Sequence, residues 1–214
     1  MKENPNVKLD AKDMMDLAVE TGMQLIPIVG GPLATIYFGI KQTKEFKRIE
    51  NFYAELANDL QKQSERIANL ENQYQNGLVS LIEQLNNKVE KEHQYYKVQL
   101  YKTYMKKLLF NLVTEQNYDQ RKTFLEILDS LSFLELETLI FLYKKQNMGP
   151  IPVKNFGNPD VSQYAIVGAV SKLKMNGLVK AVTKNLVFGG DNSLEEMVSV
   201  TDYGLEFINF CIVE

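Results

Sequence analysis

The side chains that carry most enzymatic and metal chemistry are scarce in this chain. Among 214 residues there is one histidine, His93, and one cysteine, Cys211. A cysteine–histidine zinc site, a histidine-pair metalloprotease helix and a closed iron–sulfur cage each need more such ligands. Neither standard glycine-rich phosphate loop occurs, and there is no Gly-x-Ser-x-Gly elbow. His93 stands among charged and polar neighbours, so we expect it to be a surface residue.

Carboxylates remain as the only candidates for metal chemistry. Asp13, Asp16 and Glu20 follow one another at steps of three and four in a predicted helix from about Asp10 to about Met23. Oxygen ligands on one helix face could hold Mg²⁺, but the same spacing is usual for the solvated face of an amphipathic helix. We interpret them as a solvated face and expect a non-enzymatic protein without catalytic residues, metal or cofactor.

The composition is that of a chain with enough apolar residues for one or two cores. Hydrophobic residues make up 45% and charged residues 24%, and the formal net charge is −3. No segment is strongly basic, so the usual electrostatic basis of non-specific nucleic-acid binding is missing. A single cysteine cannot form an intrachain disulfide, and no signal sequence is recognisable. We therefore expect a cytoplasmic location.

The stretch Thr21–Ile40 carries no charged residue. Its length would suffice for a membrane span, but Pro27, Gly30, Gly31 and Pro32 interrupt it, and a lone helix in lipid could not satisfy the backbone groups they expose. Two short apolar helices joined at the glycines fit better. Such a hairpin could be buried in the protein, docked on a partner, or inserted into a membrane on activation. The residues expected to make this contact are Leu25, Ile26, Ile28, Val29, Leu33, Ile36 and Phe38.

A heptad pattern follows and predicts a coiled-coil helix of about 30 residues. Asn76-Gly77 then favours a turn, and a second apolar stripe predicts a helix over 78–112, so that 46–112 would fold into a long antiparallel hairpin. We expect three parts, namely 1–40, the coiled-coil hairpin 41–118 and a C-terminal domain 119–214. The first stripe comprises Phe46, Ile49, Tyr53, Leu56, Leu60, Gln63, Ile67, Leu70 and Tyr74, and the second Leu78, Ile82, Leu85, Val89, Tyr96, Leu100, Tyr104, Leu108 and Leu112.

Tyrosines and lysines alternate in the second predicted helix. The mixture could stack bases and hold phosphates. Alternatively, Tyr96 and Tyr104 bury their rings in the hairpin while the lysines solvate its outer face, and acidic residues just upstream favour this second interpretation. The residues concerned are Tyr95, Tyr96, Tyr101 and Tyr104 with Lys97, Lys102, Lys106 and Lys107.

The pattern changes to short elements after residue 118. Ser132 and Glu135 form a predicted capping box at the start of a helix, and Gly177 should end a helix over 161–176. Residues 178–183 and 197–200 are rich in β-branched side chains and predict a β-hairpin. Thr201 should cap a last helix, 202–212.

This order of elements, with Gly177-Leu178-Val179 and with Val200-Thr201-Asp202-Tyr203-Gly204, resembles a winged helix-turn-helix domain over about 85 residues. The resemblance implies a mainly α fold with a small β-wing, and it makes Ser162, Gln163, Lys172 and Lys174 candidate nucleic-acid contacts. Residues 151–214 nevertheless carry five basic and seven acidic groups, and the helix that would read bases is expected to expose Ser162, Gln163, Ala165, Gly168 and Ala169. DNA readers present more cations than this, whereas other winged helices bind proteins.

The whole arrangement is similar to bacterial abortive-infection alpha proteins. The shared features are an apolar N-terminal part, a charged helical middle, the phrase from Phe124 to Ser132 and the phrase from Thr201 to Phe207. This resemblance implies a role in phage defence. We therefore predict an interaction protein that binds a protein partner or its own copies, with membrane contact as a further expectation. A DNA-binding transcriptional regulator is the alternative.

Overall fold

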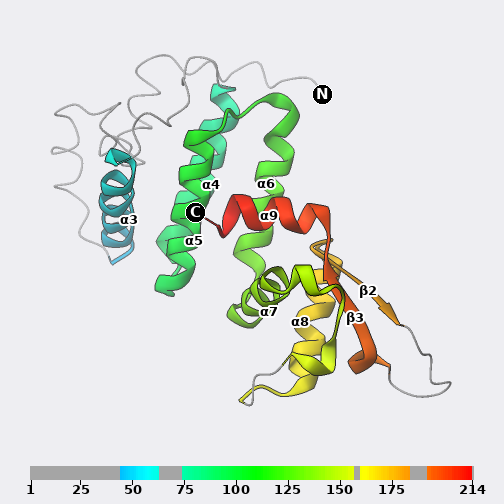
Figure 1. Cartoon of the computed structure of the whole chain (residues 1–214). Helices are drawn as coiled ribbons and strands as arrows, with labels where there is room; N and C mark the ends of the chain where they lie inside the picture. The colour runs from blue at the N-terminus through cyan, green and yellow to red at the C-terminus, as the bar shows by residue number, and fades with distance from the viewer. Residues whose placement is uncertain (1–43, 63–73, 157–159, 184–191, 214) are drawn as a thin grey trace, which may run out of the picture. The chain divides into compact units, whose positions relative to one another are not determined.

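The computed structural model describes residues 44–62, 74–156, 160–183 and 192–213 (Figure 1). These residues are mainly helical, with one small antiparallel sheet, as the sequence predicts. The chain divides after Leu125 into two units. The apolar stretch Thr21–Ile40, with all seven contact residues predicted in it, and the acidic face of Asp13, Asp16 and Glu20 lie outside the described residues.

Three helices form the centre of the N-terminal unit, namely α3 (Lys44–Gln61), α4 (Gln75–Lys91) and α5 (Tyr95–Phe110). The Tyr53 hydroxyl donates to Asn86 Oδ1 at 2.9 Å, and Arg48 reaches the Glu92 carbonyl, so α3 and α4 run antiparallel. The predicted heptad residues of α3 are buried where the structure describes them. The core they share with α4 and α5 includes Ile49, Tyr53, Leu56, Leu60, Leu81, Leu85, Val89, Tyr104 and Leu108.

The predicted single helix over 78–112 is wrong, because the chain turns between α4 and α5. Glu92 has an extended backbone, with φ −77° and ψ 131°. Its carboxylate accepts hydrogen bonds from the amides of His93 and Gln94, both at 2.8 Å, and so supplies the acceptors that a continuing helix would have provided. Residues 78–110 are therefore two helices rather than one arm of a hairpin. Leu112 lies beyond α5 and is exposed.

Gly77 does not end a helix as expected but lies in the first turn of α4. A Cβ on it would lie 2.2 Å from Cδ1 of Tyr74 and 2.9 Å from Cδ2 of Tyr118. These two rings meet edge to face with centroids 6.0 Å apart, and the Tyr118 hydroxyl is 3.1 Å from Ser80 Oγ. Tyr118 belongs to α6 (Glu115–Ser130), so the glycine lets the start of α6 pack closely on the start of α4.

The C-terminal unit begins within α6 and combines three further helices with a three-stranded sheet. In sequence order these are α7 (Phe133–Lys144), β1 (Ile151–Pro152), α8 (Gln163–Met175), β2 (Val179–Thr183), β3 (Glu196–Val200) and α9 (Asp202–Cys211). The strand order is β1-β3-β2, with both pairs antiparallel. The predicted β2–β3 hairpin is confirmed, whereas the two-residue β1 was not predicted.

Local capping residues fix the ends of these elements as the sequence predicts. The Glu135 amide donates to Ser132 Oγ, and the Ser132 amide donates to Glu135 Oε2 at 2.7 Å, which completes the capping box of α7. Gly177 has φ +71° just after α8. Thr201 caps α9 by accepting from the Gly204 amide at 2.9 Å, and its hydroxyl also donates to the Gly177 carbonyl at 2.6 Å. Thr201 thus ties the end of β3 to the end of α8.

Candidate interaction surface

Helix α8 is held in the C-terminal unit by one apolar side. Ile166, Ala169, Val170 and Leu173 recur at helical spacing and are all buried, and α7 and β2 pack on α8. Ala169 was expected to be exposed, but it faces this core. The opposite side of α8 is therefore the part that can meet another molecule.

The outer face of α8 consists of exposed, uncharged residues. We use this name for Tyr164, Ala165, Gly168, Ser171 and Met175, which follow the helical repeat. Tyr164 is 61% exposed and Met175 is 87% exposed, so two large apolar side chains flank three small residues. A Cβ on Gly168 would have no atom within 4 Å, so the middle of the face is open.

The lysines of α8 are engaged by carboxylates of the same unit. Lys172 Nζ lies 3.1 Å from Glu135 Oε2 and also donates to the Ser130 carbonyl. Lys174 Nζ donates to both carboxylate oxygens of Glu196 at 2.8 and 3.0 Å. The first lysine therefore reaches α7 and the end of α6, whereas the second reaches β3.

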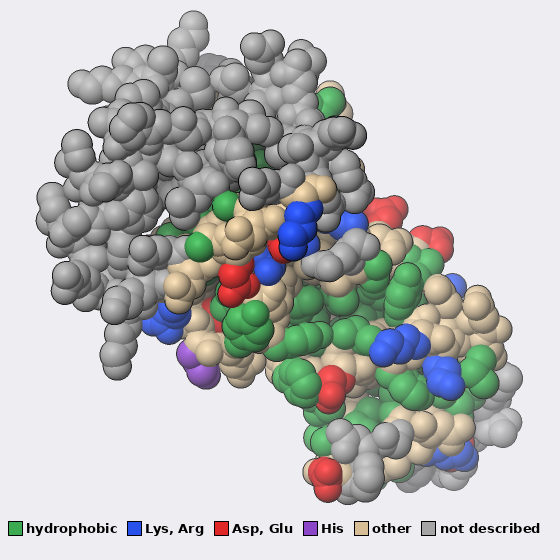
Figure 2. Space-filling view, turned by 60° about the vertical axis from the view of Figure 1, so that its left-hand side comes forward, with side chains coloured by type: hydrophobic (Ala, Val, Ile, Leu, Met, Phe, Trp, Pro, Cys, Tyr) green, Lys and Arg blue, Asp and Glu red, His purple; other side chains and the backbone are tan. Residues whose placement is uncertain are grey.

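The four predicted nucleic-acid contacts do not form one cationic surface. Ser162 precedes α8 without capping it through its side chain, and Gln163 Nε2 donates to the Lys154 carbonyl at 3.2 Å. Lys154 itself pairs with Glu195 at 2.9 Å. On the face seen in Figure 2, the described lysines and arginines lie in small groups among hydrophobic and acidic side chains, with no broad basic patch. A phosphate backbone would have to displace a carboxylate at Lys154, Lys172 and Lys174.

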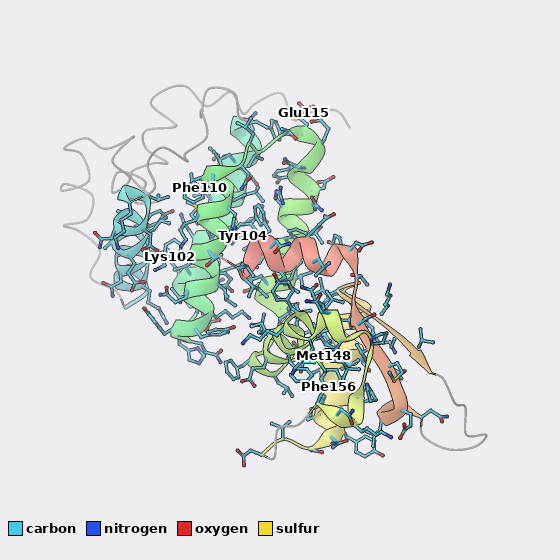
Figure 3. All side chains as sticks on the ribbon, viewed as in Figure 1. Lys102, Tyr104, Phe110, Glu115, Met148 and Phe156 are labelled. Carbon is cyan, nitrogen blue, oxygen red and sulfur yellow. The ribbon has the colours of Figure 1, made fainter. Side chains whose placement is uncertain are left out.

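A second polar group lies between α3 and α5 in the N-terminal unit. Lys102 lies on the α3 side of α5 (Figure 3). Its Nζ is 3.1 Å from Glu55 Oε2 and 3.3 Å from Asp59 Oδ2, and Lys106 Nζ is 3.4 Å from Asp59 Oδ2. Gln99 adds a hydrogen bond to Glu55 at 2.8 Å. We call Glu55, Asp59, Lys102 and Lys106 the charged ladder; because residue numbers rise together on the two helices, α3 and α5 run parallel.

The charges in the ladder stabilise one another. The hydrogen bond from Gln99 lowers the pKa of Glu55 below its usual 4.5, burial opposes this, and Lys102 lowers it further. Burial raises the pKa of Asp59, but the contacts of Lys102 and Lys106 outweigh it, so the net pKa is below 3.8. Burial likewise lowers the pKa of Lys102, yet its two carboxylate partners raise it overall above 10.5. All three groups are therefore charged at neutral pH.

Three of the four lysines of α5 are buried, so the prediction that these lysines solvate an outer face is wrong for them. The relative exposure of Lys97, Lys102 and Lys106 is 9%, 9% and 6%. Tyr104 is fully buried as expected and donates to the Arg121 carbonyl at 2.8 Å, whereas Tyr96 is 37% exposed. The signal for the ladder was present in the sequence as Glu55/Asp59 and Lys102/Lys106, two oppositely charged pairs with the same spacing of four.

The chain matches no family model, no curated protein and no solved structure. None of the described helices combines the length and the apolar composition that a membrane span requires. Among the same residues, no group of three or more His, Cys, Asp and Glu side chains is placed to hold a metal ion. The outer face of α8 is thus the candidate site that the described geometry offers.

Proposed function

We propose that the protein is a non-enzymatic interaction protein whose C-terminal unit is a winged-helix module that binds another protein through the outer face of α8. The observation that carries this proposal is the uncharged character of that face, from Tyr164 to Met175, together with the pairing of its neighbouring lysines. A face without charge is complementary to a partner surface that is also uncharged, because burial then leaves no ion without a counter-ion.

The order of elements supports the winged-helix part of the proposal. A helix, a short strand, a further helix and a β-hairpin follow one another as α7, β1, α8 and β2–β3, with β1 pairing on the third strand. In such a domain α8 would be the helix that reads DNA, and the hairpin would be the wing. Among the described residues between β1 and α8, the helical element is the short 3₁₀ turn Val153–Asn155, where the usual pattern has a full helix.

A DNA-reading role is less well supported by the same side chains. Base readout uses Arg, Lys, Asn or Gln on the outward side of the helix, and phosphate contacts need cations available to the backbone. Here the outward residues include Tyr164, Gly168 and Met175, and Lys172 and Lys174 each have a carboxylate partner. The proposed partner is therefore a protein with an apolar, uncharged contact surface.

We expect the full chain to bind no duplex DNA selectively at physiological salt. Fluorescence anisotropy of labelled duplex pools, measured over a salt series, tests this expectation. Binding to phosphates would show as an affinity that falls steeply with salt. If the chain binds DNA sequence-selectively and this binding is lost in Gln163→Ala and Tyr164→Ala, the proposal is wrong and the protein is a DNA-binding transcriptional regulator.

Photo-crosslinking tests whether this face binds a protein. A photo-crosslinking amino acid is placed at position 175, and position 144 is the matched control. Both positions are exposed at or near the end of a helix of the C-terminal unit. We expect a discrete protein adduct at 175 and not at 144, and we expect Tyr164→Asp to abolish it, since a carboxylate would be buried without a partner. An adduct that survives Tyr164→Asp, or equal adducts at both positions, would contradict the assignment of this face.

Phage defence is the cellular context we propose, on the basis of the phrases Phe124–Ser132 and Thr201–Phe207 that resemble abortive-infection alpha proteins. Bacteria that express the chain should then show fewer phage plaques than cells with an empty vector. Tyr164→Asp should restore plaque numbers if the outer face of α8 is used in that role. Unchanged plaque numbers across a panel of phages would remove the defence context without touching the binding proposal.

A further inference from the structure

Both counter-charges of Lys102 come from α3. Its Nζ lies within 3.3 Å of Glu55 and Asp59, and the only other lysine in the charged ladder, Lys106, shares Asp59. The charges that act on the two carboxylates come from α5 and from within α3 itself. Docking of α3 is thus coupled directly to the ionisation of two of its own side chains.

In the charged ladder the lysines are more deeply buried than the carboxylates. The lysine side chains are only 11% and 7% exposed, whereas those of Glu55 and Asp59 are 39% and 28% exposed. Protonating the carboxylates therefore leaves positive charge where water reaches least. An ion left buried without its partner destabilises a protein more than the intact pair stabilises it.

The ion pairs of the C-terminal unit differ in this respect. Lys172 and Lys174, paired with Glu135 and Glu196, have side chains that are 38% and 36% exposed. Water therefore reaches these two ammonium groups more than it reaches those of Lys102 and Lys106, and exposed ion pairs contribute little to stability. Acid should therefore act first on the contact between α3 and α5.

We propose that α3 is an acid-releasable strap: protonation of Glu55 and Asp59 removes both counter-charges of Lys102 and detaches α3 from α5, and the core that Leu56 and Leu60 share with α4 and α5 is lost with it, while the C-terminal unit stays folded. The two carboxylates stabilise the docked state above their ordinary ionisation range, and this contribution is lost as the pH falls. Lys102 contributes with the opposite sign, because its stabilisation is present below its ordinary ionisation range and is lost only as the pH rises well into the alkaline range.

The test follows backbone amide signals of the ¹⁵N-labelled full chain by NMR during an acid titration from neutral pH. We expect the signals of Ala54 and Asn58 in α3 to leave their docked positions at a pH below 4.5, the ordinary value for Glu55. Signals of α8 and α9 should stay in place over the same range. Simultaneous loss of α3 and of the C-terminal helices would overturn the proposal, because it would mean global acid unfolding.

The Lys102→Met variant tests whether the unpaired charge of Lys102 drives the release of α3, rather than a general destabilisation of the chain by acid. The variant removes the buried charge but leaves Glu55 its bond from Gln99 and Asp59 its contact with Lys106, so α3 should stay docked at neutral pH. We expect its release midpoint to fall by about one pH unit or more, a tenfold change in proton concentration. Lys91→Met, at an exposed position of α4, is the matched control and should titrate like the wild type. Equal midpoints for Lys102→Met and the wild type would overturn the proposal.

Discussion

Gly204→Ala is expected to destabilise the C-terminal unit by about 3 kcal/mol. A Cβ at this position would lie 2.1 Å from the Leu178 carbonyl oxygen and 2.9 Å from its carbon. These are backbone atoms held in place at the start of β2, so the clash cannot be relieved by a side-chain rotation. Moving α9 away would also weaken the hydrogen bond from the Gly204 amide to Thr201. Urea unfolding followed by amide signals of α9 and β2 measures the loss.

Gly168→Ala is the matched control for this substitution. It makes the same chemical change in an exposed helix interior where a Cβ meets nothing within 4 Å. The gain in helix propensity should stabilise the unit by about 0.5 to 1 kcal/mol. If both variants shifted the urea midpoint in the same direction and by the same amount, the close approach at Gly204 would not be the cause.

Leu60→Ala is expected to destabilise the N-terminal unit by about 2 to 4 kcal/mol. The side chain has 0% relative exposure near the end of α3. Its removal deletes buried methyl groups and leaves a space that helices fixed by several polar contacts cannot fill. Urea unfolding monitored by α4 and α5 amide signals gives the change in free energy.

Asn58→Ala serves as the control for Leu60→Ala because Asn58 is exposed on the same helix. Replacing a weak helix former by alanine should leave stability unchanged or raise it slightly. A Leu60→Ala variant as stable as Asn58→Ala would show that the heptad stripe of α3 does not form a packed core.

The C-terminal unit could be predicted closely because its signals are local. The capping box of Ser132, the left-handed Gly177 and the Thr201 cap each depend on a few neighbouring residues, and all three are confirmed. The strand pair β2–β3 also follows from its β-branched composition. Strand β1 escaped prediction because its two residues, Ile151 and Pro152, are too few to carry a periodic pattern and one of them is a proline.

The N-terminal unit could be predicted only in part. The heptad stripe correctly places Tyr53, Leu56 and Leu60 in a core. The turn at Glu92 was missed because the apolar stripe continues past it in the sequence, while the carboxylate that ends α4 bonds to its own next two amides and has no periodic signature. That turn reverses the chain, which is why α5 runs parallel to α3 and not antiparallel.

The candidate surface on α8 could not be predicted from the sequence alone. Tyr164 is a large apolar residue like Ile166 and Leu173, but it lies on the other side of α8 and is 61% exposed, whereas those two are buried. The sequence likewise shows Lys172 and Lys174 as two neighbouring cations. Only the fold brings Glu135 and Glu196 to them, from elements 37 and 22 residues away along the chain.

The hydrogen bonds of Thr201 determine from which end the β2–β3 hairpin can open. Its hydroxyl donates to the carbonyls of Gly177 and Leu178 while its amide donates to Leu178, which fastens the hairpin where β2 begins and β3 ends. Fraying must therefore start at the opposite end, at the pair Thr183–Glu196, and advance toward Val179–Val200 one rung at a time. The β2–β3 pair can therefore open progressively from its Thr183–Glu196 end, while the hydrogen bonds of Thr201 keep its other end joined to the end of α8.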